Sequence, residues 1–210
     1  MNLTKLFEMQ KVLDQKIYDR FPGLKEEPWD WKITALLTEL GECANEHRGF
    51  KRWSANQQPN TFLACGRCRG RGIAFKSILR DDPFECPKCK GGKGTNPLLE
   101  EYVDCIHFFL SIAIELNMFP QNLHVFEDHT EETIEQSFNR VFYEVSSISA
   151  LRDRDAPKRV TQEDLQEILY IAFSCFVGIG EQFLGFTWNQ VEDAYFAKNE
   201  VNHVRQAEGY

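Results

Sequence analysis

The sequence predicts an all-α helical bundle that is interrupted by one small cysteine-rich module. Outside residues 54–96, apolar residues recur at the three- and four-residue spacing of helices that bury one face. Inside that segment the helical spacing stops, and four of the seven cysteines gather. The rest of the sequence has no convincing strand pattern, repeat or low-complexity tract. We therefore assign residues 1–53 and 97–210 to the bundle and residues 54–96 to an inserted module.

The first two predicted helices follow from apolar periodicity and from the residues that stop it. Residues 3–20 place most of their apolar side chains on one face, and a Phe-Pro-Gly sequence ends them. Residues 29–48 begin a helix near Asp30 and end it before Gly49.

Capping residues locate the remaining helices. Asn96 followed by Pro97 suits a cap and a first helical turn, so a helix is predicted over 97–117. Thr130 and Thr161 are candidate caps for the two helices after it. The predicted ranges of these last helices are 131–151, 162–184 and 188–204.

Composition sets the class and the expected compartment. Hydrophobic residues make up 42% of the chain and charged residues 27%, which is ordinary for a globular protein. No window approaches 18 consecutive apolar residues, and the N-terminus has no apolar signal region. Three cysteines stand alone among apolar neighbours and are expected to be buried thiols, which favours a reducing cytoplasm. They are Cys43, Cys105 and Cys175.

Two C-x2-C pairs separated by 17 residues predict a zinc site. Paired thiolates at this spacing close on one tetrahedral ion, and the second pair completes a closed structural site. Bound zinc would also explain how a segment with little apolar content is ordered. A redox role or a disulfide pair is the competing interpretation. The expected ligands of the single structural zinc are Cys65, Cys68, Cys86 and Cys89.

The cysteine segment is also basic. Residues 65–94 carry eight basic and three acidic side chains, a net charge of +5, in a chain whose net charge is -8. The overall acidity argues against nucleic-acid binding by the whole surface. We expect the local positive charge to offset the thiolates rather than to bind RNA or DNA, since only Phe75 and Phe84 offer rings for stacking.

Two carboxylate pairs predict a second metal site. Each pair has i, i+3 spacing within a predicted helix, which puts both side chains on one helix face. Two such helices side by side would gather four carboxylates, whose repulsion a bound cation relieves. Oxygen ligands without soft neighbours favour Mg²⁺ or Mn²⁺. A single E-x-x-E is weak evidence, because solvated helices often contain one. The residues are Glu39, Glu42, Glu101 and Asp104.

A stripe of cations near the C-terminus raises the significance of these acids. Lys198, Asn202 and Arg205 share one helix face and could hold an anion such as phosphate. The alternative is an ordinary charged helix end that the helix dipole favours.

Taken together, these motifs resemble the dimeric, all-α dUTPase family of the all-α nucleoside triphosphate pyrophosphohydrolases. The E-x-x-E helix, followed by Phe50-Lys51-Arg52-Trp53, resembles the first metal helix and its exit, and the E-x-x-D-x-x-His-Phe sequence resembles the second. The tail resembles the K-x3-N-x2-R-x4-Y sequence that ends such chains, and Met9-Gln10 resembles the Leu-Gln of the base-recognition helix. The likeness covers helices along most of the chain.

The resemblance implies a Mg²⁺-dependent hydrolysis of dUTP, and of dUDP, to dUMP, with pyrophosphate released from dUTP, by a homodimer. The four carboxylates would hold two or more Mg²⁺ ions, and Glu42 would also orient the attacking water as general base. His107 is expected to support the site or to be a satisfied core histidine. The implied phosphate contacts are Lys198, Asn202, Arg205 and Tyr210, with Lys51 a weaker candidate; the implied base and sugar contacts are Gln10, Trp53 and Phe108.

Two departures from the family pattern leave alternatives open. Asp14 stands where the family commonly has Asn, so the substrate could instead be another nucleotide such as dCTP. The connection between the two metal helices is long, and the cysteine module fills it. A di-iron bundle is a poor alternative, since its Glu-x-x-His motif occurs only near the C-terminus, at Glu200 and His203. A non-enzymatic zinc-ribbon protein that binds nucleic acid or a partner is a further alternative.

Overall fold

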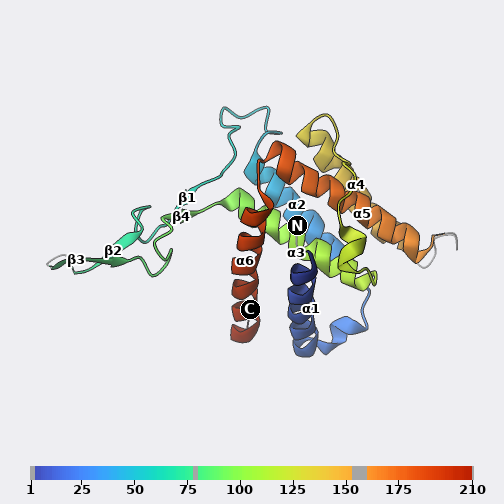
Figure 1. The fold of residues 1–210 in the computed structure, drawn as a ribbon, viewed down its shortest axis with the longest axis horizontal. Coiled ribbons are helices and arrows are strands. Elements are labelled where there is room, and N and C mark those ends of the chain that lie inside the picture. The colour runs from blue at the N-terminus through green and yellow to red at the C-terminus, as the bar shows by residue number, and fades with distance from the viewer. Residues whose placement is uncertain (1–2, 78–79, 153–159, 210) are drawn as a thin grey trace.

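A computed structural model, which describes residues 3–77, 80–152 and 160–209, shows six α-helices, of which α1, α2, α5 and α6 pack against α3 (Figure 1). The all-α prediction is confirmed, since the described strands all lie between residues 63 and 95. Helices α1 and α6 lie side by side, and α2 and α3 pack against each other. The bounds are α1 Leu3–Arg20, α2 Asp30–His47, α3 Pro97–Glu115, α4 Ile134–Arg152, α5 Gln162–Gly178 and α6 Trp188–Glu208. Short helical turns occupy η1 Pro22–Lys25, η2 Pro120–Leu123 and η3 Ile179–Phe183.

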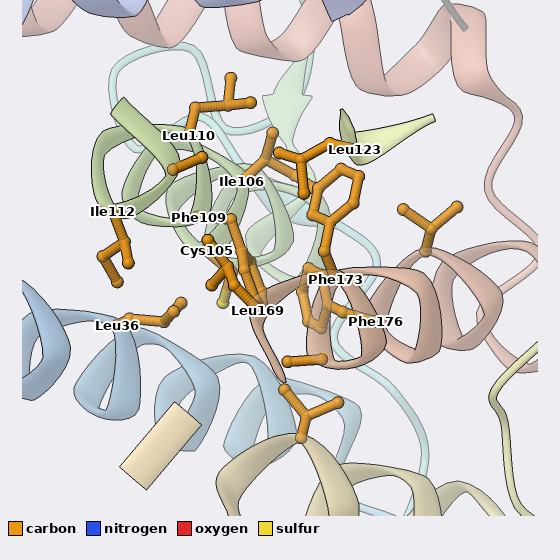
Figure 2. Close-up of a cluster of buried hydrophobic side chains, with 14 of the residues drawn as sticks. Leu36, Cys105, Ile106, Phe109, Leu110, Ile112, Leu123, Leu169, Phe173 and Phe176 are labelled. Carbon is orange, nitrogen blue, oxygen red and sulfur yellow. The ribbon is translucent and has the colours of Figure 1, made fainter. Parts of the chain in front are cut away.

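The core forms where α3 meets α2 and α5. Figure 2 shows aromatic and aliphatic side chains of α3 and α5 interlocking, with Leu36 of α2 closing one side. The Phe109 ring centroid lies 5.5 Å from that of Phe173 and 5.4 Å from that of Phe176. Each of these buried rings contributes roughly 1.5–3 kcal/mol to the free energy of unfolding. The core therefore fixes α3 between its neighbours.

The predicted helix starts are right in two cases and wrong in one. The Asn96 side chain accepts a hydrogen bond from the Leu99 backbone N–H, and Thr161 forms a reciprocal cap with Asp164. The predicted cap Thr130 is wrong, because its backbone N–H and hydroxyl both donate to the Asp128 carboxylate in the preceding turn. Helix α4 starts at Ile134 instead of 131, and the Thr133 hydroxyl caps it.

The predicted helix over 162–184 consists of α5 followed by the π-helical turn η3. Gly180 in this turn lies directly against the buried Tyr102 ring, which stacks on Phe176 at a centroid distance of 4.5 Å. No single helix among the described residues is long and apolar enough to cross a membrane; one pair bent by 115°, Gln162–Phe183 with Trp188–Glu208, meets the length and composition criteria only when taken together.

The cysteine segment projects from the bundle as two small antiparallel strand pairs beyond the start of α3 (Figure 1). Strands β1 (Leu63–Ala64) and β4 (Gly94–Thr95) pair antiparallel and form its neck. Strands β2 (Ile73–Ser77) and β3 (Arg80–Glu85) pair antiparallel farther out.

The connection before the neck is tied to the bundle. The Asn60 backbone N–H donates to the Glu46 carbonyl at 2.9 Å, and the Leu98 N–H donates to the Asn60 carbonyl at 3.1 Å. Both ends of the segment are therefore held where α2 ends and α3 begins. The boundaries of a separate module at residues 54 and 96 stay a prediction.

The close approach of Gly180 to Tyr102 generates a stability prediction. A Cβ atom at Gly180 would lie 2.3 Å from the Tyr102 hydroxyl oxygen and 2.6 Å from its ring carbon Cζ, inside a filled core. Gly180→Ala should therefore lower the free energy of unfolding by about 1–3 kcal/mol. Urea denaturation measures this as a lower midpoint with an unchanged slope.

The matched control is Gly41→Ala in the middle of α2, where a Cβ meets nothing within 4 Å. This substitution should raise stability by about 0.5–1 kcal/mol, because alanine has the higher helix propensity. Equal midpoints for the two variants would contradict the packing argument.

Candidate functional site

Helices α2 and α3 bring the predicted acids together. Both helices bury apolar residues against each other, and the same contact places their carboxylates at one edge of the interface. Carboxylate oxygens of Glu39, Glu42 and Glu101 lie within 4.8 Å of one another. Asp104, one turn farther along α3, forms an ion pair with Lys198 of α6. We call these four residues the acidic cluster.

Burial and mutual repulsion raise the pKa values of the acidic cluster. The pKa of Glu101 rises to about 7, first because the group is partly buried and then because Asp104, Glu39 and Glu42 lie near it. Burial is also the main cause of the raised pKa of Glu39 and of Asp104, although the Lys198 ammonium counteracts it at Asp104. Carboxylates in this state favour a bound cation or a proton.

A cavity of about 290 Å³ opens beside the acidic cluster, between α1, α2, α3 and α6. Glu39 and Asp104 line it, as do three predicted phosphate contacts of α6: Lys198, Asn202 and Arg205. We call it the central pocket. A larger surface hollow of about 660 Å³ lies between Pro28 and Arg152, away from these residues. The central pocket is the better candidate, because among the described pockets it alone is lined by members of the acidic cluster together with the α6 cations.

The floor of the central pocket is a buried polar network. The Lys32 ammonium lies 3.2 Å from Asp14 Oδ2 and 2.5 Å from Glu115 Oε1, with a side chain only 1% exposed. Burial by itself would lower the pKa of Lys32, but Asp14 and Glu115 outweigh it and the pKa is raised. Gln10 Nε2 donates to Asp14 Oδ1 at 2.7 Å, and the Ser111 hydroxyl donates to Asp14 Oδ2 at 2.6 Å.

The network continues from Gln10 to His107. Gln10 Oε1 lies 2.8 Å from His107 Nδ1 and accepts a hydrogen bond from the Tyr195 hydroxyl at 2.9 Å. The His107 and Tyr195 rings stack with centroids 3.9 Å apart. Burial, with the nearby Lys198 and His203, lowers the pKa of His107 to about 3, so the imidazole is neutral.

Three polar atoms of residues that line the pocket are buried without a hydrogen-bond partner among the described residues. They are His107 Nε2, Trp31 Nε1 and Gln206 Oε1. Buried polar groups are nearly always paired, so each unpaired one needs an explanation. A polar ligand in the central pocket would supply partners for such atoms.

The structure brings most of the predicted site residues together. Gln10 and Phe108 line the central pocket with the acids and the α6 cations, and Glu42 and Glu101 lie in the adjoining acidic cluster. Trp53 does not reach this pocket: its side chain is 78% exposed and meets Phe50 edge-to-face.

Two further predicted phosphate contacts, Lys51 and Tyr210, are not among the described residues that line the central pocket. Lys51 bonds to Asn45 and does not line the central pocket. Tyr210 lies outside the described residues.

The sequence analysis did not predict that Lys32 and Ser111 both donate hydrogen bonds to Asp14. A signal was present on α3, where Asp104, His107 and Ser111 form a polar stripe at i, i+3 and i+7 in the apolar middle of the helix. Lys32 gave no such signal, because its partners lie 18 and 83 residues away along the chain.

The four module cysteines form a second potential metal site. Their sulfur atoms all lie within 4.8 Å of one another, with Cys65 and Cys86 at 4.0 Å and Cys68 and Cys89 at 3.6 Å. Tetrahedral zinc–thiolate bonds of about 2.3 Å imply sulfur–sulfur distances of roughly 3.8 Å. All four cysteines are free thiols rather than disulfides.

The turns around these thiols have the geometry of a metal-binding knuckle. The Gly72 backbone N–H donates to Cys68 Sγ at 3.3 Å, and the backbone N–H of Cys68 helps to lower the pKa of Cys65 to about 7. Gly72 has φ +76°, and a Cβ there would lie 2.7 Å from the Gly91 carbonyl oxygen. Glycine is therefore required at this turn.

Comparison with known proteins identifies the bundle. A family model described as dUTPase matches residues 2–63 and 83–210; between these ranges, residues 64–82 of the cysteine segment are unmatched. Searches of the curated proteins and of the solved structures give no match. The matched residues include the acidic cluster, the polar floor of the pocket and the α6 cations. The chain therefore belongs to the all-α dUTPase family of dUTP-hydrolysing enzymes.

Proposed function

We propose that this protein hydrolyses dUTP, and also dUDP, to dUMP in a Mg²⁺-dependent reaction that releases pyrophosphate from dUTP. The observation that carries this proposal is the position of the acidic cluster at one end of the central pocket, with cations of α6 lining the same pocket. At one end of the pocket, the α6 cations and metal ions held by the acids could bind phosphates. At the other end, neutral polar groups could bind a nucleoside. A non-enzymatic zinc-ribbon protein would have no need of this arrangement.

The acidic cluster fits Mg²⁺ by the chemistry of its donors. All four side chains offer carboxylate oxygens, which are the ligands that Mg²⁺ prefers, and no thiol or imidazole belongs to the cluster. Burial and the neighbouring carboxylates raise the pKa of Glu101 to about 7 in spite of the nearby Lys198 ammonium, so a further cation at the cluster would be favourable. When bound, Mg²⁺ would activate a water and neutralise phosphate charge. The four carboxylates provide enough ligands for two ions.

The remaining residues would position the substrate around the acids. Lys198 neutralises Asp104 in the free protein and can turn to a phosphate oxygen when substrate arrives. Asn202 and Arg205 follow on the same face of α6 and would hold the leaving pyrophosphate. Glu42 is the exposed member of the acidic cluster and would hold the attacking water as general base.

Phe108 and Gln10 would face the nucleoside. Phe108 is half-buried in the pocket wall, where an aromatic ring can pack against the deoxyribose. Asp14 does not offer its carboxylate to the base, because Gln10, Ser111 and Lys32 already donate to it. The effect of Asp14 on base choice is therefore indirect.

The cysteine segment would hold one structural zinc, and the protein would act as a homodimer. The sulfur distances and the knuckle turns support zinc. The dimer is proposed from family membership.

The first prediction for this site concerns charge repulsion and Mg²⁺. The pKa of Glu101 is raised from its ordinary 4.5 to about 7, so its ionised form destabilises the fold as pH rises through this window. Glu101→Gln should therefore raise the melting temperature at pH 8 in the presence of a chelator, and this gain should vanish below pH 4.5. The same variant should lose both turnover and the rise in melting temperature that MgCl₂ gives the wild-type protein.

Glu100→Gln is the matched control, since Glu100 is the exposed neighbour on α3 and lies outside the acidic cluster. It should keep the Mg²⁺-induced stabilisation. An unchanged response to MgCl₂ in Glu101→Gln would refute the metal assignment, whatever the activity.

The second prediction concerns α6. Arg205→Ala should lower kcat for dUTP by roughly tenfold to a thousandfold, by analogy with removal of one donor to a developing negative charge. The melting temperature without nucleotide should barely change, because Arg205 is exposed. Lys11→Ala, which removes an exposed cation of α1 outside the pocket, should leave both properties as in the wild type. A large loss of stability with unchanged kcat would mean that Arg205 is structural.

The third prediction concerns zinc. Replacing Cys65 and Cys68 together by Ser should release about one zinc per chain, measured by metal analysis of the purified protein. The helical circular-dichroism signal should persist, because the bundle core lies outside the module. Cys175→Ala should keep its zinc, since that buried thiol lies outside the cluster. A zinc-free wild-type protein would contradict the assignment.

A further inference from the structure

We propose that His107 is a specificity-determining residue, whose Nε2 accepts a hydrogen bond from a donor on the nucleoside of the substrate. This inference rests on the proposed function, and it adds to it a residue whose chemical form is set by the buried network beneath the pocket. The network connects Lys32 to His107 through Asp14 and Gln10.

The buried Lys32 ammonium sets the charge of Asp14. The Lys32 ammonium lies 3.2 Å from Asp14 Oδ2 and is almost completely shielded from solvent. A buried ammonium needs anionic partners, and Asp14 and Glu115 are the carboxylates in contact with it. Asp14 therefore carries a negative charge, and a carboxylate in this state can only accept hydrogen bonds.

The Asp14 carboxylate sets the orientation of the Gln10 amide. Because Asp14 only accepts, the amide group that lies 2.7 Å from Asp14 Oδ1 must be the Nε2 donor. Gln10 Oε1 then faces the other way, toward His107 Nδ1 at 2.8 Å and the Tyr195 hydroxyl at 2.9 Å. The reversed amide would place an oxygen against a carboxylate.

The Gln10 amide oxygen sets the tautomer of His107. An amide oxygen accepts hydrogen bonds, so His107 Nδ1 must carry the proton that it shares with Gln10 Oε1. In the neutral ring, Nε2 is then an unprotonated acceptor. The stacked Tyr195 ring holds the imidazole plane, so this acceptor has a fixed direction.

This acceptor has no partner among the described residues, although His107 is only 5% exposed and lines the central pocket. A buried acceptor without a partner is unfavourable, and a ligand donor at this point would relieve the penalty. Nε2 is also closed to solvent, so neighbouring side chains must shift before the donor reaches it. The pocket thus favours a ligand that brings a donor to His107 over one that brings another acceptor.

Deoxyuridine offers two donors of the required kind, the ring N3–H and the 3′-hydroxyl. Both are neutral and match a neutral imidazole. Two analogues separate them: 3-methyl-dUTP lacks the N3–H, and 2′,3′-dideoxy-UTP lacks the 3′-hydroxyl.

The experiment measures kcat/KM for dUTP and for both analogues with the wild-type enzyme, His107→Phe and His107→Gln. With the wild type, one analogue should lose at least tenfold relative to dUTP. His107→Phe should lose a similar factor on dUTP and show no further loss with that analogue. His107→Gln can place an amide oxygen near the position of Nε2 and should recover part of the loss.

His203→Phe is the matched control, since His203 lies on α6 and bonds to Lys16 outside the central pocket. It should show the same analogue penalties as the wild type. Analogue penalties that are equal in the wild type and in His107→Phe, for both analogues, would overturn the inference.

A measurement on the protein itself tests the network without turnover. The ¹⁵N chemical shifts of the His107 ring in the wild-type protein should identify a neutral imidazole with its proton on Nδ1, and a proton on Nε2 would overturn the inference. Failure of the proposed function is distinguishable, because the wild type would then not hydrolyse dUTP while the tautomer could still be read. Hydrolysis of dUTP without coupling to His107 would overturn only the present inference.

Discussion

The contact between α2 and α3 is the constraint on which the site depends. The two helices bury apolar side chains against each other, and i, i+3 spacing on both places four acids along the same edge. Core packing thereby holds carboxylates together that would separate in water. Burial is the main cause of the raised pKa values of Glu39, Glu101 and Asp104, repulsion between the carboxylates adds to it, and Lys198 from α6 partly offsets both. The need of the site for cations is thus a direct consequence of how the fold buries its core.

The central pocket joins two electrostatic environments across a short distance. On one side, acids and the α6 cations suit phosphates and the metals that accompany them. On the other side, the buried Lys32 ammonium pairs with Asp14 and Glu115, and the pocket-lining Gln10 and His107 are uncharged. Neutral donors and acceptors can discriminate between bases through the direction of their hydrogen bonds. In the proposed function, the buried ion pair would support the recognition of a neutral base by orienting Gln10 and His107.

Much of this arrangement could be predicted from the sequence, because periodic patterns carry it. The helix positions, the Asn96 and Thr161 caps and the two acid pairs all follow from spacing within one segment. The error at Thr130 arose because a threonine can cap a helix or bond to a nearby Asp in a turn, and local sequence does not separate these choices. The pairing of Lys32 with Asp14 and Glu115 could not be predicted, since it depends on how three helices meet.

The two-residue ladder between β1 and β4 has a consequence for how this chain came to carry its cysteines. Leu63 faces Thr95 and Ala64 faces Gly94, so the segment leaves and rejoins the bundle at a single point. The dUTPase family model leaves residues 64–82 unmatched, so its gap begins at this neck and covers Cys65 and Cys68 but not Cys86 and Cys89. A segment whose ends meet can be gained, lost or exchanged during evolution while α2 and α3 keep their mutual register. The geometry of the neck thus makes the bundle tolerant of changes in the appendage beside its site.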